Sequence, residues 1–203
     1  LLTLLEEEYP ELQPRIVESQ TENLLQRLRD GHIDVAVLAT PTAASGVTDI
    51  PLYDEAFAVV TSPEHPLAGR GDLPLEALKD MDLLLLDDGH CLRDQIVELC
   101  KLAEVNRTPG AQSATRATSL TTVVQLVVAG LGSTLVPLSA VATECGRPGL
   151  AVSTFDASVD AKRTVGLAVR ASSRRHAEFE QLGQLITRAY REATESGRTL
   201  LPR

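Results

Sequence analysis

Short aliphatic runs alternate with amphipathic stretches along the chain. Residues 33–39 (IDVAVLA) and 83–86 (LLLL) are continuous apolar runs of strand length, typical of strands buried on both faces of a sheet. Between such runs, Leu24, Leu25 and Leu28 share one face and predict a helix over residues 22–31, with Thr21 as its N-cap. This alternation predicts an α/β fold with mostly parallel sheets.

The same pattern places the remaining elements. Strands are expected at residues 15–18, 50–53, 57–61, 134–136, 151–155 and 164–169. Helices are expected at 92–104, 118–131 and 173–194, with a single helical turn at 75–79. Residues 63–74 hold three prolines and two glycines and predict a surface loop, and residues 106–111 predict a turn.

Two stretches, 39–54 and 156–162, are candidate crossings between two lobes. On this interpretation residues 1–53 and 163–203 form lobe I, whereas residues 54–162 form lobe II. The first ten residues predict an amphipathic helix that Pro10 ends, although no capping residue precedes Leu1. We therefore expect the chain to begin inside a longer protein.

Composition narrows the classes of function. The 203 residues include 19 basic and 28 acidic ones, a net charge of −9, which argues against nucleic-acid binding by this chain alone. Six aromatic residues and no Trp argue against stacking surfaces for bases or sugars. No apolar run is long enough to cross a bilayer, and three cysteines are too few for a disulfide framework, so we expect a cytoplasmic protein.

Several catalytic and cofactor motifs are absent from the sequence. It contains no P-loop, no G-x-S-x-G and no H-E-x-x-H. Gly130 and Gly132 lack the third glycine of a dinucleotide fingerprint and are interpreted as a helix C-cap. The four histidines are scattered, so we expect no metal site and no cofactor.

The most informative segment is 87–100, DDGHCLRDQIVELC. Cys91 follows a Gly-containing loop and opens the predicted helix, where the helix dipole and free backbone N–H groups favour the thiolate. His90 and Arg93 add positive charge beside it. The alternative is that Cys91 is an inert, buried thiol, as free cysteines often are.

Cys100 stands nine residues after Cys91. On a continuous helix this spacing corresponds to about 13.5 Å of rise and opposite faces. A disulfide needs Cα atoms roughly 4.4–6.8 Å apart, so the two cysteines can join only if the helix unwinds or moves. The alternative is a core position, because Ile96, Leu99, Cys100 and Ala103 form a helical stripe. Cys145, in a predicted loop, has no evident partner.

The segment 87–100 resembles the sensor segment of the OxyR-type, peroxide-responsive branch of the LysR family of transcriptional regulators. G-H-C-L-R-D-Q with the second cysteine nine residues on is highly specific for that branch. Further LysR-like pieces follow the family order over nearly the whole chain, at residues 18–25, 30–34, 51–55, 116–120, 129–132, 135–137 and 163–167. The resemblance implies a two-lobed effector domain similar to periplasmic binding proteins, with lobe II carrying the cysteines.

The resemblance also implies roles for the two cysteines. Cys91 matches the peroxide-reactive cysteine, which becomes a sulfenic acid, and Cys100 matches the resolving cysteine that forms the disulfide. Thr21 matches a threonine that helps to hold peroxide, although its place at a helix start is also explained by capping.

Other residues of the expected peroxide site follow from the same comparison. Gln95 matches a position that contributes to peroxide reduction, and His90 and Asp94 belong to the same pocket. Arg163 matches a basic residue that stabilises the thiolate, with a solvated charge at a strand start as the alternative. Arg116 is a weaker candidate for that basic role.

The implied partners are hydrogen peroxide, a second copy of the chain, and thiol reductants such as glutaredoxin or thioredoxin. DNA would be bound only through an N-terminal winged helix-turn-helix, which this chain lacks, as it lacks the first strand of lobe I. The protein would be a stoichiometric sensor and not an enzyme, with no membrane partner.

Two alternatives from other classes of function remain open. One is a LysR-type domain that binds a small organic effector in the cleft between its lobes, with incidental cysteines. The other is a thiol peroxidase, which would show steady turnover with a reductant.

Overall fold

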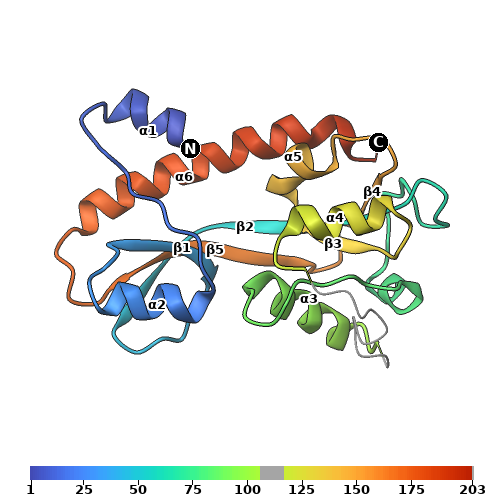
Figure 1. Ribbon diagram of the computed structural model, residues 1–203, viewed down its shortest axis with the longest axis horizontal. Helices are drawn as coiled ribbons and strands as arrows, with labels where there is room; N and C mark the ends of the chain where they lie inside the picture. Colours follow the sequence, from blue (N-terminus) through green and yellow to red (C-terminus); the bar gives the residue numbers. More distant parts are fainter. Residues whose placement is uncertain (106–116, 203) are drawn as a thin grey trace. The chain divides into compact units, whose positions relative to one another are not determined.

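The computed structural model describes residues 1–105 and 117–202. The chain divides into two compact units (Figure 1). Unit 1 comprises Leu1–Asp54 and Thr164–Glu192, and unit 2 comprises Glu55–Arg163 and Ala193–Arg203. Among the described residues, no helix is both long enough and apolar enough to cross a membrane.

Unit 1 is built around an antiparallel pair of strands, β1 (Val35–Thr40) and β5 (Lys162–Arg170). Val35 lies opposite Val169 and Thr40 lies opposite Thr164. Helix α2 (Thr21–Arg29) and helix α6 (His176–Gly197) pack on opposite faces of this pair (Figure 1).

Alternation along β5 explains the two layers of unit 1. Ala168 points to the α2 side, where it packs with Leu25 and Leu28. Its neighbours Leu167 and Val169 point to the other side, where they meet residues of α6. Because successive strand residues face opposite ways, one short strand contributes to both apolar layers.

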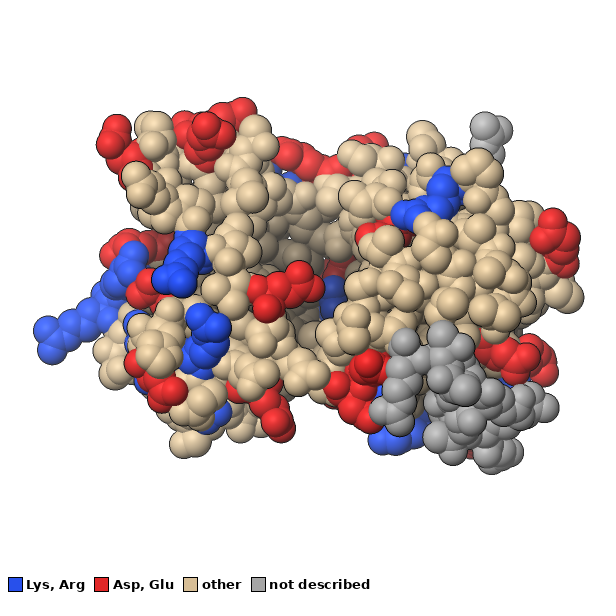
Figure 2. Space-filling view, in the orientation of Figure 1, with Lys and Arg blue, Asp and Glu red and all other residues tan. Residues whose placement is uncertain are grey.

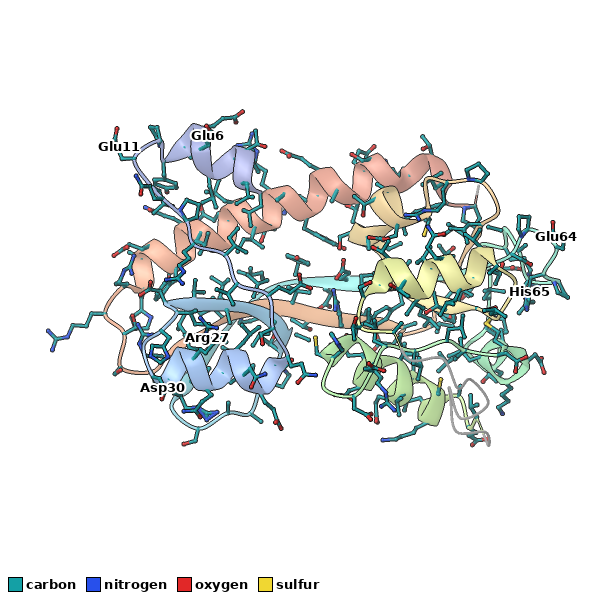
Figure 3. The ribbon with its side chains drawn as sticks, in the orientation of Figure 1. Glu6, Glu11, Arg27, Asp30, Glu64 and His65 are labelled. Atoms are coloured by element: carbon teal, nitrogen blue, oxygen red, sulfur yellow. The ribbon has the colours of Figure 1, made fainter. Side chains whose placement is uncertain are left out.

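The first helix, α1 (Leu2–Glu8), packs against α6. Leu4 and Leu5 are buried against Leu185 of α6. Glu6 and Glu11 are exposed on the outer side (Figure 3). The expected amphipathic helix is therefore present, although Leu1 and Leu2 remain largely exposed.

Unit 2 is organised on the second half of β2 (Val47–Thr61). This strand pairs antiparallel with β3 (Thr134–Pro137) and with β4 (Ala151–Thr154). The helices of the unit are α3 (Cys91–Leu102), α4 (Leu120–Val128) and α5 (Val141–Cys145). Single 3-10 turns lie at Leu75–Asp80, Leu138–Ala140 and Arg198–Leu200.

One large apolar core fills unit 2. Phe57, Val59 and Val60 of β2 are fully or nearly fully buried in it, together with Leu135 of β3 and Val124 of α4. Cys100, Ile96 and other residues of α3 belong to the same core. Helix α3 is thus anchored in the core by apolar contacts, whereas Cys91 at its start is only partly buried.

Most expected helices are confirmed. The helix expected at 92–104 is α3, and the one expected at 118–131 is α4, whose Ser119 hydroxyl accepts a hydrogen bond from the Thr122 N–H as an N-cap. The helix expected at 173–194 is α6, and the turn at 75–79 is the first 3-10 turn. The turn expected at 106–111 lies outside the described residues.

The two-lobed α/β fold is confirmed, but the expected strand directions need correction. The ladders among the described strands are antiparallel, and parallel pairing occurs as isolated bridges, such as Leu83 with Ser133 and Leu86 with Ala117. β1 is not buried on both faces, because Val37 is 47% exposed. An apolar run alone does not reveal the strand that it pairs with.

Local predictions also failed at several points. Residues 15–18 form no strand, and the strands expected at 50–53 and 57–61 are one continuous strand, β2. Cys145 ends helix α5 and does not lie in a loop. Ala193–Arg203 belongs to unit 2, although residues 163–203 were all expected in lobe I; Arg163 belongs to unit 2 as well.

Candidate redox site

Cys91 is the first residue of α3, directly after a tight loop. Gly89 adopts φ 88°, a left-handed conformation that glycine reaches without strain, and this turns the chain into the helix. His90 is the N-cap residue, and its backbone carbonyl accepts from the N–H groups of Arg93 and Asp94 at 2.9 and 3.4 Å. Cys91 is a partly buried free thiol at the positive end of the helix dipole.

The expected positive charge of Arg93 is opposed by two carboxylates. Its guanidinium lies 3.0 Å from the Asp88 carboxylate and 3.9 Å from that of Asp94. Both carboxylates are largely exposed. Arg93 therefore holds the loop 87–90 to the first turn of α3, and its charge is shared with these acidic groups.

Cys100 lies on the opposite side of α3 from Cys91, in the core of unit 2. It is 1% exposed, and the predicted stripe is confirmed because Ile96, Leu99 and Ala103 are also buried. Burial raises the pKa of the Cys100 thiol to about 11. Cys100 is consequently a protonated, inert thiol as long as it stays in the core.

The helix between the two cysteines is intact over its twelve residues. Nine residues of α-helix correspond to about 13.5 Å of rise, roughly twice the Cα separation that a disulfide allows. Both thiols are free. The structure therefore holds the two cysteines apart by means of the helix that carries them.

A buried polar network joins α3 to the strands of unit 2. The Arg163 guanidinium donates to one oxygen of Glu55, from Nε at 2.8 Å and with Nη2 at 2.7 Å. The other Glu55 oxygen accepts from the Ser139 N–H at 3.1 Å. Arg163 Nη1 donates to Oε1 of Gln95 on α3 at 3.4 Å. Arg163 thus connects the start of β5 with the second turn of α3.

Arg163 also lies over an aromatic ring, with its guanidinium carbon 5.9 Å from the Phe57 centroid. Its side chain is only 18% exposed. The alternative of a solvated charge at a strand start therefore does not hold for Arg163. Its hydrogen bonds to Glu55 and Gln95 place it beside α3.

Six of the seven expected site residues lie in unit 2. His90, Cys91, Asp94, Gln95 and Cys100 are on or directly before α3, and Arg163 reaches the helix through Gln95. Thr21 lies in unit 1 as the first helical residue of α2, and Gln20 is the N-cap position, so Thr21 is not the cap that the sequence predicted. Arg116 lies outside the described residues.

Sequence reasoning missed Glu55 and Ser139. Glu55 is a carboxylate in the middle of β2, directly before the apolar run 56–60, and it is 1% exposed. A charged residue within the run 55–61 was the available signal, since such a group is buried only with partners. Among the described residues, no group of three or more His, Cys, Asp or Glu could hold a metal ion.

A family model, the LysR substrate binding domain, matches residues 1–191. The chain belongs to this family. Curated relatives are OxyR-type regulators: a probable hydrogen peroxide-inducible genes activator of Mycobacterium avium is 47% identical over 89% of this chain, and the Escherichia coli K12 dual regulator OxyR is 36% identical over 92%. The chain spans 57% and 59% of these two relatives, less than two thirds of their length.

Solved OxyR structures share the fold of this LysR-family chain. A cysteine-to-serine mutant of Corynebacterium glutamicum OxyR with bound H2O2 is 56% identical, with a TM-score of 0.93 over 98% of this chain and 62% of that one. The oxidized form of the same protein, also 56% identical, has a TM-score of 0.84 and covers 100% of this chain and 62% of that one. The reduced Pseudomonas regulatory domain is 34% identical, with a TM-score of 0.78 over 92% and 88%.

Proposed function

We propose that this chain is the regulatory domain of a transcriptional regulator that senses hydrogen peroxide through Cys91. The observation that carries the proposal is one intact helix with a partly exposed thiol at its start and a core-buried thiol nine residues later. The mycobacterial relatives, each named a probable hydrogen peroxide-inducible genes activator, support the same oxidant.

The first step is oxidation of Cys91. Its thiolate attacks one peroxide oxygen, so an S–O bond forms and the O–O bond breaks. Sulfur gives up two electrons and becomes a sulfenic acid, while the released hydroxide takes up a proton and leaves as water. The helix start favours this step because its N–H groups stabilise the attacking thiolate.

The second step joins the two cysteines. The Cys100 sulfur loses its proton and attacks the Cys91 sulfur, forming the S–S bond and releasing the oxygen as a second water molecule. With a pKa of about 11, only on the order of one Cys100 thiol in 10,000 is ionised at pH 7 while it is buried. Opening of α3 therefore brings Cys100 into reach and also exposes it to water.

Oxidation would then change the packing of unit 2. Cys100, Ile96 and Leu99 belong to the core, so unwinding α3 withdraws several apolar side chains from it. Helix α3 would then have two conformations, and the disulfide bond would shift the equilibrium toward the open one. We propose that the regulator transmits it to DNA through an N-terminal domain, that copies of the chain pair, and that cytoplasmic thiol reductants reset the disulfide.

The test is intact mass with thiol mapping after about one equivalent of hydrogen peroxide. We expect a loss of two hydrogens, mapped to Cys91 and Cys100 and reversed by dithiothreitol. The buried Cys145 should remain a free thiol and serves as an internal control. If Cys91 and Cys100 stayed reduced in a folded sample, the proposed function would be wrong.

Two variants separate the steps. Cys91→Ser should abolish oxidation at low peroxide, whereas Cys100→Ser should stop at the sulfenic acid, which dimedone traps at Cys91. Cys145→Ser is the matched control and should form the disulfide like the parent protein. Full oxidation of the Cys91→Ser protein would contradict the assignment of Cys91.

A further inference from the structure

The buried carboxylate of Glu55 has three hydrogen-bond or ion-pair contacts with two residues. Arg163 Nε and Nη2 meet one oxygen, and the Ser139 N–H meets the other. A carboxylate that is 1% exposed must have such partners, because burial of an uncompensated charge is costly. Glu55 therefore restricts the position of Arg163.

The planar guanidinium transfers this restriction to α3. With Nε and Nη2 directed at Glu55, the remaining nitrogen, Nη1, points away from the carboxylate and reaches Gln95. A guanidinium can only donate hydrogen bonds, so the Gln95 atom that faces it must be the amide oxygen. Glu55 and Arg163 thereby fix the orientation of the Gln95 amide, with its oxygen toward Arg163.

With its oxygen facing Arg163, the Gln95 side chain has its NH2 group left as a hydrogen-bond donor on the face of α3 that carries Cys91. Gln95 follows Cys91 by four residues, so the two side chains share one face of the helix. Negative charge develops on the departing peroxide oxygen as the O–O bond breaks, and an oriented N–H donor stabilises it. An amide with its oxygen turned toward the peroxide would oppose that charge.

We propose that Glu55 is a positioning residue for the reaction of Cys91 with peroxide, acting through Arg163 to hold the Gln95 amide as a donor. This inference rests on the proposed function of Cys91. The polar contacts of the Glu55 carboxylate are with Arg163 and Ser139, so it acts through the chain Glu55–Arg163–Gln95.

The experiment compares two reagents at Cys91 in the reduced chain at pH 7. Hydrogen peroxide requires stabilisation of a departing oxygen, whereas iodoacetamide reports the reactivity of the thiolate without that requirement. Rate constants are measured for both by quenching and mapping modified Cys91. In Glu55→Gln, the ratio of the peroxide to the iodoacetamide rate constant should fall about tenfold or more.

A double-mutant cycle tests the route. Gln95→Leu should lower the same ratio by a similar factor, and the Glu55→Gln, Gln95→Leu double variant should be no worse than the lower single variant. Arg163→Lys keeps a positive charge for Glu55 but loses the planar fork, and it should also lower the ratio. Arg163→Lys provides an alternative test of the proposal if Glu55→Gln does not fold.

Glu144→Gln is the matched control, because Glu144 is also a carboxylate of unit 2 that pairs with an arginine, Arg147, and its side chain is 19% exposed. Both rate constants should stay within about twofold of the parent protein. An unchanged ratio in Glu55→Gln, or losses that add in the double variant, would overturn the role of Glu55. A parent protein whose Cys91 does not react with peroxide would instead refute the proposed function, and this inference with it.

Discussion

Two thiols, Cys100 and Cys145, are 1% and 3% exposed, and desolvation raises the pKa of each from 9.0 to about 11. For Cys145 the neighbouring Glu144 adds to this effect and Arg147 opposes it. Because the folded-state pKa lies above the ordinary value, the unfolded chain releases these protons first as the pH rises. The stability that the neutral thiols contribute is therefore complete below about pH 9 and is lost between about pH 9 and 11.

Cys145→Ala should weaken this alkaline loss of stability. Each thiol accounts for a decrease in the free energy of unfolding on the order of 2–3 kcal/mol between pH 9 and 11. The substitution also leaves a small cavity, so the informative quantity is the pH dependence and not the absolute stability. Denaturant unfolding of the reduced protein at several pH values measures it. The same pH dependence in Cys145→Ala and the parent protein would contradict this prediction.

Helix α3 must open for Cys91 and Cys100 to join, and hydrogen exchange should detect this. In the reduced protein, α3 amides that bond within the helix should be protected from exchange. In the disulfide form, the amides between Cys91 and Cys100 should lose protection, because about 13.5 Å of helical rise cannot coexist with the bond. Helix α4, which carries no redox cysteine, is the control. Equal protection of α3 in both forms would rule out the switch.

The backbone at Gly132 leaves no room for a side chain. Its φ is 151°, and a Cβ there would lie 2.4 Å from the backbone oxygen of Asp82, beside the bridge from Leu83 to Ser133. We expect Gly132→Ala to destabilise unit 2 by about 2–4 kcal/mol. Gly130→Ala, with φ 77° but no atom within 4 Å of the added Cβ, should cost only about 1–2 kcal/mol. Chemical denaturation of both variants tests this, and equal losses would contradict the steric argument.

Helices were predictable to a greater extent than strand pairing. The stripe Ile96, Leu99, Cys100 and Ala103 identified α3 and its buried face because helical periodicity is local. Strand direction is not local: the run 33–39 gave no indication that β1 would pair antiparallel with β5, more than 120 residues later. Gln95 was found through the resemblance to OxyR-type regulators, whereas its connection to Glu55 depends on side-chain geometry that neither periodicity nor motif spacing encodes.

Across the whole chain, each boundary between the two units falls inside or at the end of a secondary-structure element. β2 spans Val47–Thr61, β5 spans Lys162–Arg170 and α6 spans His176–Gly197, and the units meet in sequence at 54/55, 163/164 and 192/193. Arg163, which donates a hydrogen bond to Gln95 of α3, is the last residue of unit 2 before β5 enters unit 1. The hydrogen bond from Arg163 therefore links α3 to a residue that is covalently next to unit 1.

Surface charge gives no indication that this chain alone binds DNA. The net charge is −9, and on the face shown in Figure 2 basic side chains are interspersed with acidic ones. Phosphate contact requires clustered Lys and Arg, so the charge of this chain does not support DNA binding by the chain alone. The function proposed for the chain is accordingly a change of conformation and not a binding event of its own.

A sensor and a peroxidase differ in the amount of peroxide that each chain consumes. If the Cys91–Cys100 disulfide needs a separate reductant, the purified reduced chain should consume about one equivalent of hydrogen peroxide, since one disulfide stores two electrons, and then stop. Residual peroxide and free thiols can be measured together over time, with Cys91→Ser as the control that should consume almost none. Sustained consumption of many equivalents in the presence of thioredoxin or glutaredoxin at a rate typical of enzymes would favour a thiol peroxidase.

Reversible thermal stabilisation by an organic metabolite in Cys91→Ser as well as in the parent protein would instead favour a small-molecule effector domain, because the thiols would then play no part.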